Sequence, residues 1–292
     1  MTEQIAHRRL HPFGVEIEVD CTARCSDDQQ EELRRLYAID GLIVARGQSL
    51  TMNQQRAFVS IFGPVLDNDF ENSYVSNVRD DGILGTTEIR FHNDVTYLPA
   101  PYLGASLYAI ELGEGAAATR FASGMRAYDR LPEKLRTRIE PLRSLQARAH
   151  GDNRRTRLGD LEPGDICSVH AVVGRQQGTG RRYIFVNPVA TDSIIGLAEA
   201  ESEALLAELF DHLYAADEVY RHDWQLGDIV IWDNLAVHHA RDDASRARRT
   251  LQRVTIAQLG YADQYPLDVM KIRREKDTQA IHASGVQPTV QD

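Results

Sequence analysis

Short apolar segments recur along the chain, and most of them predict β-strands. The clearest span residues 73–76, 102–112, 182–186, 228–232 and 251–256. Each is a run of aliphatic, β-branched or aromatic residues next to turn-forming ones, a pattern that is typical of buried strands. Many short strands with interspersed helices predict a mainly β fold with helical additions, built on an antiparallel double-sheet barrel or sandwich.

Four segments carry helix signals. The first begins at Ser26, has acidic residues in its first turn and is followed by Gly41, which are good start and stop signals. A short buried strand is expected at 42–45, directly after it. The other helical segments span 51–63, 124–142 with a break at Leu131–Pro132, and 199–216, the last being the most amphipathic.

Composition and charge narrow the class of protein. Of the 292 residues, 42% are hydrophobic and 26% charged, which is ordinary for a globular protein. We expect one domain over residues 1–263 and a polar C-terminal tail over 264–292. The net charge of −10 argues against binding to nucleic acid. No apolar stretch reaches the roughly 18 residues of a membrane span, and no secretory signal is evident, so we expect a cytoplasmic protein.

A candidate metal site comes from two distant segments. In a strand, His92 and Asp94 would point to the same side, because side chains alternate. Alone, this pair is weak evidence, since short motifs recur by chance. A second histidine, His239, follows the apolar segment 228–232 and a turn. Two histidines and one carboxylate on one face of a metal are the ligand set of non-haem iron(II) oxygenases.

Two arginines in the last strand segment are candidate anion ligands. Arg249, Leu251 and Arg253 share one face of that strand. Neighbouring guanidinium groups repel each other unless an anion lies beside them, and a dicarboxylic acid would supply one through bidentate pairing. The alternative is a solvated basic edge, which this pattern alone would favour.

Five segments in order resemble the taurine dioxygenase and 2,4-dichlorophenoxyacetate dioxygenase family (TauD/TfdA-like). The similarity runs from about Gly41 to Ile256 and includes the two arginines just described. The other four segments are HNDVTYLPAPYLGASLYAIEL, AAATRFASGMRAYDRLP, TGRRYIFVNPVATDSIIGL and GDIVIWDNLAVHHAR. The resemblance implies a double-stranded β-helix, or jelly-roll, cupin-like core, with Fe(II) as cofactor and 2-oxoglutarate and O₂ as cosubstrates.

The same resemblance assigns the metal ligands. It implies that His92, Asp94 and His239 bind the iron. His239 is preferred over His238 because it lies seven positions after Trp232, as in the family.

Further site residues also follow from the resemblance. It implies that Thr119 and Arg249 hold the far carboxylate of 2-oxoglutarate, and that Arg253 contacts an anionic group of the substrate. Asn77 and Val95 are expected to line the substrate pocket, and the polar segment 150–166 is a candidate lid.

The implied reaction is oxidation of a C–H bond in a small molecule, with release of succinate and CO₂. Hydroxylation is the simplest outcome, and desaturation, cyclisation or epoxidation would use the same ligands. The substrate would be an anion or a natural-product intermediate. Two alternatives are a zinc hydrolase and a non-catalytic metal-binding barrel, but the hydrolase leaves Thr119 and Arg249 without a role. The sequence leaves the oligomeric state open, and a homo-oligomer is compatible with it.

Overall fold

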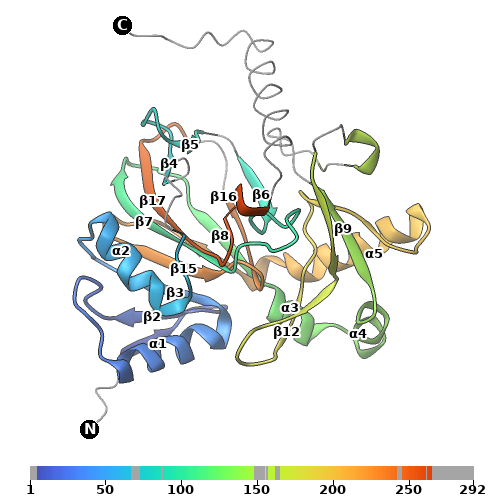
Figure 1. Ribbon diagram of the computed structural model, residues 1–292, viewed down its shortest axis with the longest axis horizontal. Coiled ribbons are helices and arrows are strands. Elements are labelled where there is room, and N and C mark those ends of the chain that lie inside the picture. Colours follow the sequence, from blue (N-terminus) through green and yellow to red (C-terminus); the bar gives the residue numbers. More distant parts are fainter. Residues whose placement is uncertain are drawn as a thin grey trace, which may run out of the picture.

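Two β-sheets form the centre of the molecule (Figure 1). The computed structural model describes residues 5–66, 73–86, 88–147, 155, 157–161, 165–241, 245–260 and 262–264. The larger sheet has eight strands in the order β1-β2-β3-β15-β7-β17-β4-β5. Their bounds are Ala6–Arg9 (β1), Val15–Glu18 (β2), Leu42–Ala45 (β3), Ile229–Asp233 (β15), Gly104–Leu112 (β7), Arg249–Ile256 (β17), Tyr74–Ser76 (β4) and Ile83–Leu84 (β5).

The smaller sheet has four strands in the order β14-β8-β16-β6. They are Val219–His222 (β14), Thr119–Ser123 (β8), Val237–Arg241 (β16) and Ile89–His92 (β6), and all pair in antiparallel fashion. Buried apolar side chains of both sheets, including Phe121, Trp232 and Leu251, pack together in one core cluster. The chain therefore has the predicted mainly β, double-stranded β-helix core.

Two helices cover one side of the larger sheet (Figure 1). Helix α1 (Asp27–Asp40) and helix α2 (Met52–Val59) both begin with a capping box, formed by Ser26 with Gln29 and by Thr51 with Gln54. A short 3₁₀ turn, η1 (Ser60–Phe62), extends α2. Apolar residues of these helices, such as Leu33, Leu36 and Phe58, pack in a cluster with Ile229, Ile231 and Val254 of the sheet.

The remaining helices lie at the opposite side of the sheets (Figure 1). The segment 124–142 contains α3 (Gly124–Arg130) and α4 (Glu133–Ile139), interrupted at Leu131–Pro132 as predicted. With α5 (Glu199–Leu213) they form a second apolar cluster. The other elements of the described chain are β9 (Arg143–Ala147), β10 (Cys167–Ala171), β11 (Val173–Arg175), β12 (Arg182–Ile184), β13 (Thr191–Ile194), η3 (Leu158–Asp160), η4 (Ala216–Glu218) and η5 (Ala262–Gln264).

The proposed lid and tail lie largely outside the described residues. Within the segment 150–166, Arg155 and Arg157 form ion pairs with Glu203 of α5. At the start of the expected tail, Gln264 forms hydrogen bonds with the backbone of Ala100, and residues 265–292 lie outside the described chain. In the described part of the chain, no helix is long and apolar enough to cross a membrane.

We expect Gly41→Ala to destabilise the fold more than Gly47→Ala does. Both glycines have a left-handed backbone, with φ of 70° and 64°. An added Cβ at Gly41 would lie 3.0 Å from Cβ of Asp233 and 3.1 Å from Cγ2 of Val237, whereas Gly47 has open space around it. Backbone strain alone costs about 1–2 kcal/mol, and the crowding at Gly41 adds to it. Equal melting temperatures for the two variants would contradict this packing.

Candidate active site

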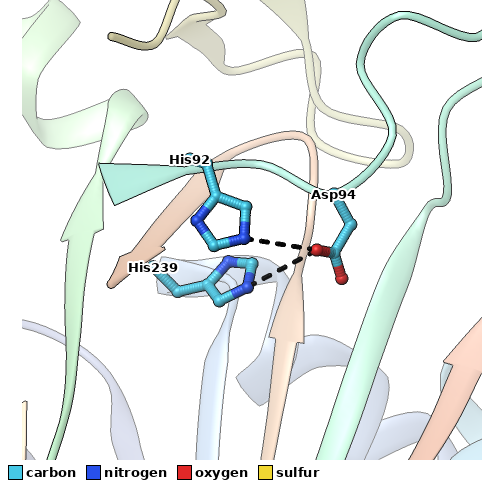
Figure 2. Close-up of side chains that lie close together, drawn as sticks. All are labelled: His92, Asp94 and His239. Carbon is cyan, nitrogen blue, oxygen red and sulfur yellow. Dashed lines mark ion pairs between the residues drawn. The ribbon is translucent and has the colours of Figure 1, made fainter. Parts of the chain in front are cut away.

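His92 and His239 of the smaller sheet lie together with Asp94, which follows strand β6 (Figure 2). His92 and His239 face each other on the paired strands β6 and β16. Oδ1 of Asp94 is 3.4 Å from Nε2 of His92 and 3.7 Å from Nε2 of His239. The three candidate ligand atoms all lie within 4.8 Å of one another. The structure thus brings together residues that are 147 positions apart, since 239 − 92 = 147.

Asp94 reaches this cluster in a different way from the one predicted. Strand β6 ends at His92, so Asp94 lies in the turn that follows rather than on the same strand face. Asn234 fixes this turn from a distance. Its side chain accepts a hydrogen bond from the Asp94 backbone nitrogen at 2.7 Å and donates one to the Asp94 carbonyl at 3.0 Å. The sequence analysis missed Asn234, although it stands in the Trp-Asp-Asn segment.

The protonation states suit a divalent metal. Nδ1 of His92 lies 2.9 Å from the Arg90 carbonyl, so the tautomer that donates there leaves Nε2 free to bind metal. Burial, with a smaller contribution from His92, lowers the pKa of His239 to about 3, so the His239 ring is neutral at neutral pH. Burial would raise the pKa of Asp94, but the charge of the nearby Arg253 guanidinium group holds it well below its usual range. Two imidazole nitrogens and one carboxylate oxygen fit Fe(II).

His238 has a separate environment from its neighbour. It is fully buried, and its ring lies 3.1 Å from the Tyr214 hydroxyl and 3.2 Å from the Ile184 carbonyl. Burial lowers its pKa to about 4. His238 therefore has the surroundings of a packing residue with two polar partners of its own.

A cavity of about 180 Å³ adjoins the three candidate ligands. Thr119, Arg249 and Arg253 line it together with the ligands. The rest of its wall is mainly apolar and includes Val75, Ile83, Leu84, Ile89, Leu107 and Trp232. One compartment thus presents a metal-binding face, cationic groups and an apolar surface.

Arg249 is a buried cation that lacks a charged partner among the described residues. It is 5% exposed and its Nη2 donates to Oγ1 of Thr119 at 3.0 Å. Its Nε is buried and has no hydrogen-bond partner in the described chain. Burial, with a smaller contribution from the nearby Arg241, lowers the pKa of Arg249 to about 9, so the group stays protonated at neutral pH. The burial of Arg249 excludes the alternative that this residue belongs to a solvated basic edge. A buried cation without a charged partner favours binding of an anion.

Arg253 contacts a candidate metal ligand directly. Its Nη2 lies 2.8 Å from Oδ2 of Asp94, and the Arg253 side chain is 11% exposed. Oδ1 of the same carboxylate faces the two histidines. Arg253 therefore fixes which oxygen of Asp94 points toward the candidate metal position.

Asn77 and Val95, the two other residues predicted to line the pocket, contact neighbouring parts of the protein. The Asn77 side chain donates to the Ala247 carbonyl at 2.7 Å and accepts from the Arg249 backbone nitrogen at 2.9 Å, so it braces the start of β17. Val95 has a left-handed backbone with φ of 50° and packs against the cluster of Leu98 and Tyr102. A contact of either residue with substrate stays a prediction.

We expect Arg253→Ala to weaken divalent-metal binding by roughly 10- to 100-fold, the usual effect of removing a residue that orients a metal ligand. Without the guanidinium group, the Asp94 carboxylate can rotate and its charge is uncompensated. Competition with a chromophoric chelator measures the metal affinity. Arg248→Ala is the matched control, because Arg248 is exposed and pairs with Glu111. A metal affinity equal to wild type in Arg253→Ala would contradict the positioning role.

The comparison with known families agrees with this geometry. Residues 6–255 match the family model described as "Taurine catabolism dioxygenase TauD, TfdA family". The chain belongs to this family. This dioxygenase therefore uses Fe(II) as cofactor and 2-oxoglutarate, also called alpha-ketoglutarate, and O₂ as cosubstrates.

Individual relatives have related activities. The dioxygenase is 32% identical to the alpha-ketoglutarate-dependent 2,4-dichlorophenoxyacetate dioxygenase of Cupriavidus pinatubonensis, over 84% of this chain and 95% of the relative. It is 30% identical to pentalenolactone F synthase of Streptomyces arenae, over 63% of this chain and 67% of the relative. Among solved structures, a taurine dioxygenase from Burkholderia xenovorans superposes with a TM-score of 0.74 at 25% identity, covering 89% of this chain and 94% of that one.

Proposed function

We propose that His92, Asp94 and His239 hold the Fe(II) of this dioxygenase. The observation that carries the proposal is the convergence of their ligand atoms, within 4.8 Å, at the wall of a cavity that also contains Arg249. When bound, Fe(II) and 2-oxoglutarate together activate O₂, and the cosubstrate is converted to succinate and CO₂. The protein residues hold the metal, orient the reactants and exclude water.

Arg249 and Thr119 are the proposed ligands of the far carboxylate of 2-oxoglutarate. Both residues line the cavity. Nη2 of Arg249 already donates to Thr119, and the unpaired Nε of Arg249 is a further donor for a bound carboxylate. A carboxylate would compensate the buried charge in bidentate fashion. A zinc hydrolase has no need of such a site, so the pair favours the oxygenase over that alternative.

The proposed reaction is hydroxylation of an unactivated C–H bond in a small molecule. The apolar wall formed by Val75, Ile89 and Leu107 suits a largely hydrocarbon substrate. Arg253 borders the same cavity and is the proposed contact for an acidic group of the substrate. Relatives that act on an aryloxyacetate and in natural-product synthesis both fit a compact molecule of this kind.

An anaerobic titration with Fe(II) and 2-oxoglutarate tests the proposal first. Chelation of the keto acid by iron is expected to give a weak visible absorption band that neither component gives alone. Release of succinate on addition of O₂ and a panel of apolar acids then identifies substrates, and a product with one added oxygen atom establishes hydroxylation. Protein that binds iron but shows neither the band nor succinate formation would favour a hydrolytic or non-catalytic metal site.

A further inference from the structure

A tryptophan lies next to the proposed cosubstrate site without lining the cavity. Nε1 of Trp224 donates a hydrogen bond to Oγ1 of Thr119 at 3.0 Å. Nη2 of Arg249 donates to the same oxygen, also at 3.0 Å. Thr119 and Arg249 line the cavity, whereas Trp224 is not among the described residues that do. Thr119 therefore receives two hydrogen bonds from its surroundings.

These two hydrogen bonds determine what the Thr119 hydroxyl group can still do. A hydroxyl group has two lone pairs and one hydrogen. Trp224 and Arg249 occupy both lone pairs, so the hydrogen is the group's remaining hydrogen-bonding function. Because Thr119 borders the cavity, this hydrogen is available to a molecule bound there, and only an acceptor can pair with it.

We propose that Trp224 is a positioning residue that makes Thr119 an obligate hydrogen-bond donor to the far carboxylate of 2-oxoglutarate. The inference rests on the proposed cosubstrate site. Without the indole N–H, the threonine hydroxyl would be free to rotate and to donate elsewhere. With it, the hydroxyl hydrogen and the guanidinium group of Arg249 are presented together to one carboxylate.

The surroundings of Trp224 hold the indole ring in place. His222 is fully buried and its ring lies at 81° to the indole, with ring centroids 4.5 Å apart. Oδ2 of Asp228 lies 3.2 Å from Nε2 of His222 and also forms an ion pair with Arg46. Asp228 therefore helps to hold the His222 ring against the indole. On the cosubstrate side, the Arg249 guanidinium carbon lies 5.8 Å from the centroid of the indole ring. Trp224 thus contacts both proposed carboxylate ligands.

This arrangement predicts selectivity for a keto acid with a second carboxylate. The donors aimed at the far end of the site gain a partner only when an oxygen acceptor is present there. 2-Oxovalerate has the same carbon chain length as 2-oxoglutarate but lacks the far carboxylate, so its binding should be insensitive to Trp224. The comparison of the two ligands isolates the far end of the site from the metal end.

The test measures both keto acids by calorimetry on the full chain, loaded with Mn(II) in the absence of O₂. We expect Trp224→Phe to weaken 2-oxoglutarate binding by about tenfold, as for loss of one hydrogen bond that supports a charged group, and to leave 2-oxovalerate binding unchanged. In a Thr119→Val background, the same tryptophan substitution should have no further effect, because Trp224 acts through the hydroxyl group.

Several outcomes would overturn the proposal. These are an unchanged 2-oxoglutarate affinity in Trp224→Phe, an equal loss for both keto acids, or additive losses in the double variant. Benzothienylalanine at position 224 keeps the bicyclic shape but lacks the N–H, and it repeats the test if the phenylalanine variant folds poorly. Failure of the wild-type protein to bind 2-oxoglutarate with metal would instead refute the proposed function, so the two failures are distinguishable.

Discussion

His239→Ala is expected to abolish 2-oxoglutarate turnover, whereas His238→Ala is expected to retain a substantial part of it. His239 contributes one of three converging ligand atoms, and its ring is already neutral and directed at Asp94. Removal of residues that only orient a ligand costs roughly 10- to 100-fold in metal affinity or activity, so loss of a direct ligand should cost more than about 100-fold. The visible band with Fe(II) and 2-oxoglutarate should disappear with it.

The control variant should show the opposite combination of effects. His238→Ala removes a fully buried ring and leaves the Tyr214 hydroxyl and the Ile184 carbonyl without that partner. We expect a loss of about 2–3 kcal/mol in the free energy of unfolding, with turnover kept in the folded protein. Succinate formation and thermal unfolding, measured on both variants at the same temperature, separate the two roles. Equal losses of turnover would refute the assignment of His239 as the ligand.

Arg249→Ala is expected to raise the dissociation constant of 2-oxoglutarate by about a hundredfold or more. Truncation of one member of a buried charge pair typically costs 2–5 kcal/mol or more, because the other charge is left desolvated and unpaired. Arg249 is nearly fully buried and has an unsatisfied Nε, so the bound carboxylate would lose its main cation. Metal affinity should change little, since Arg249 does not contact the candidate metal ligands in the described structure.

Calorimetry with Mn(II)-loaded protein measures this effect, and Arg248→Ala supplies a matched control. Arg248 precedes Arg249 in the chain, but it is exposed and pairs with Glu111. Its removal should leave the 2-oxoglutarate affinity within about twofold of wild type, as for most exposed ion pairs. An unchanged affinity in Arg249→Ala would move the carboxylate site to another cation of the cavity, with Arg253 the first candidate.

Local sequence signals predicted the main helices and strands and the kind of chemistry. Helix α1 is capped by Ser26 and followed by Gly41, where its start and stop were predicted, because capping hydrogen bonds and the left-handed glycine act within a few residues. The buried strand at 42–45 and the helix interruption at Leu131–Pro132 also agree with the prediction from the sequence. The residue types and order of the His92, Asp94 and His239 segments indicated a metal site, since few ligand sets suit Fe(II).

The contacts that hold these residues in place depend on the three-dimensional arrangement of the strands. Asp94 lies beyond the end of its strand and is fixed by Asn234, 140 positions away, while Trp224 contacts Thr119 across 105 positions. Arg253, expected to contact substrate, binds Asp94 in the structure. Such contacts leave no periodic pattern in the sequence, because they depend on which strands become neighbours and on where each strand stops. Sequence motifs thus predicted the candidate ligands, and strand pairing placed the side chains that support them.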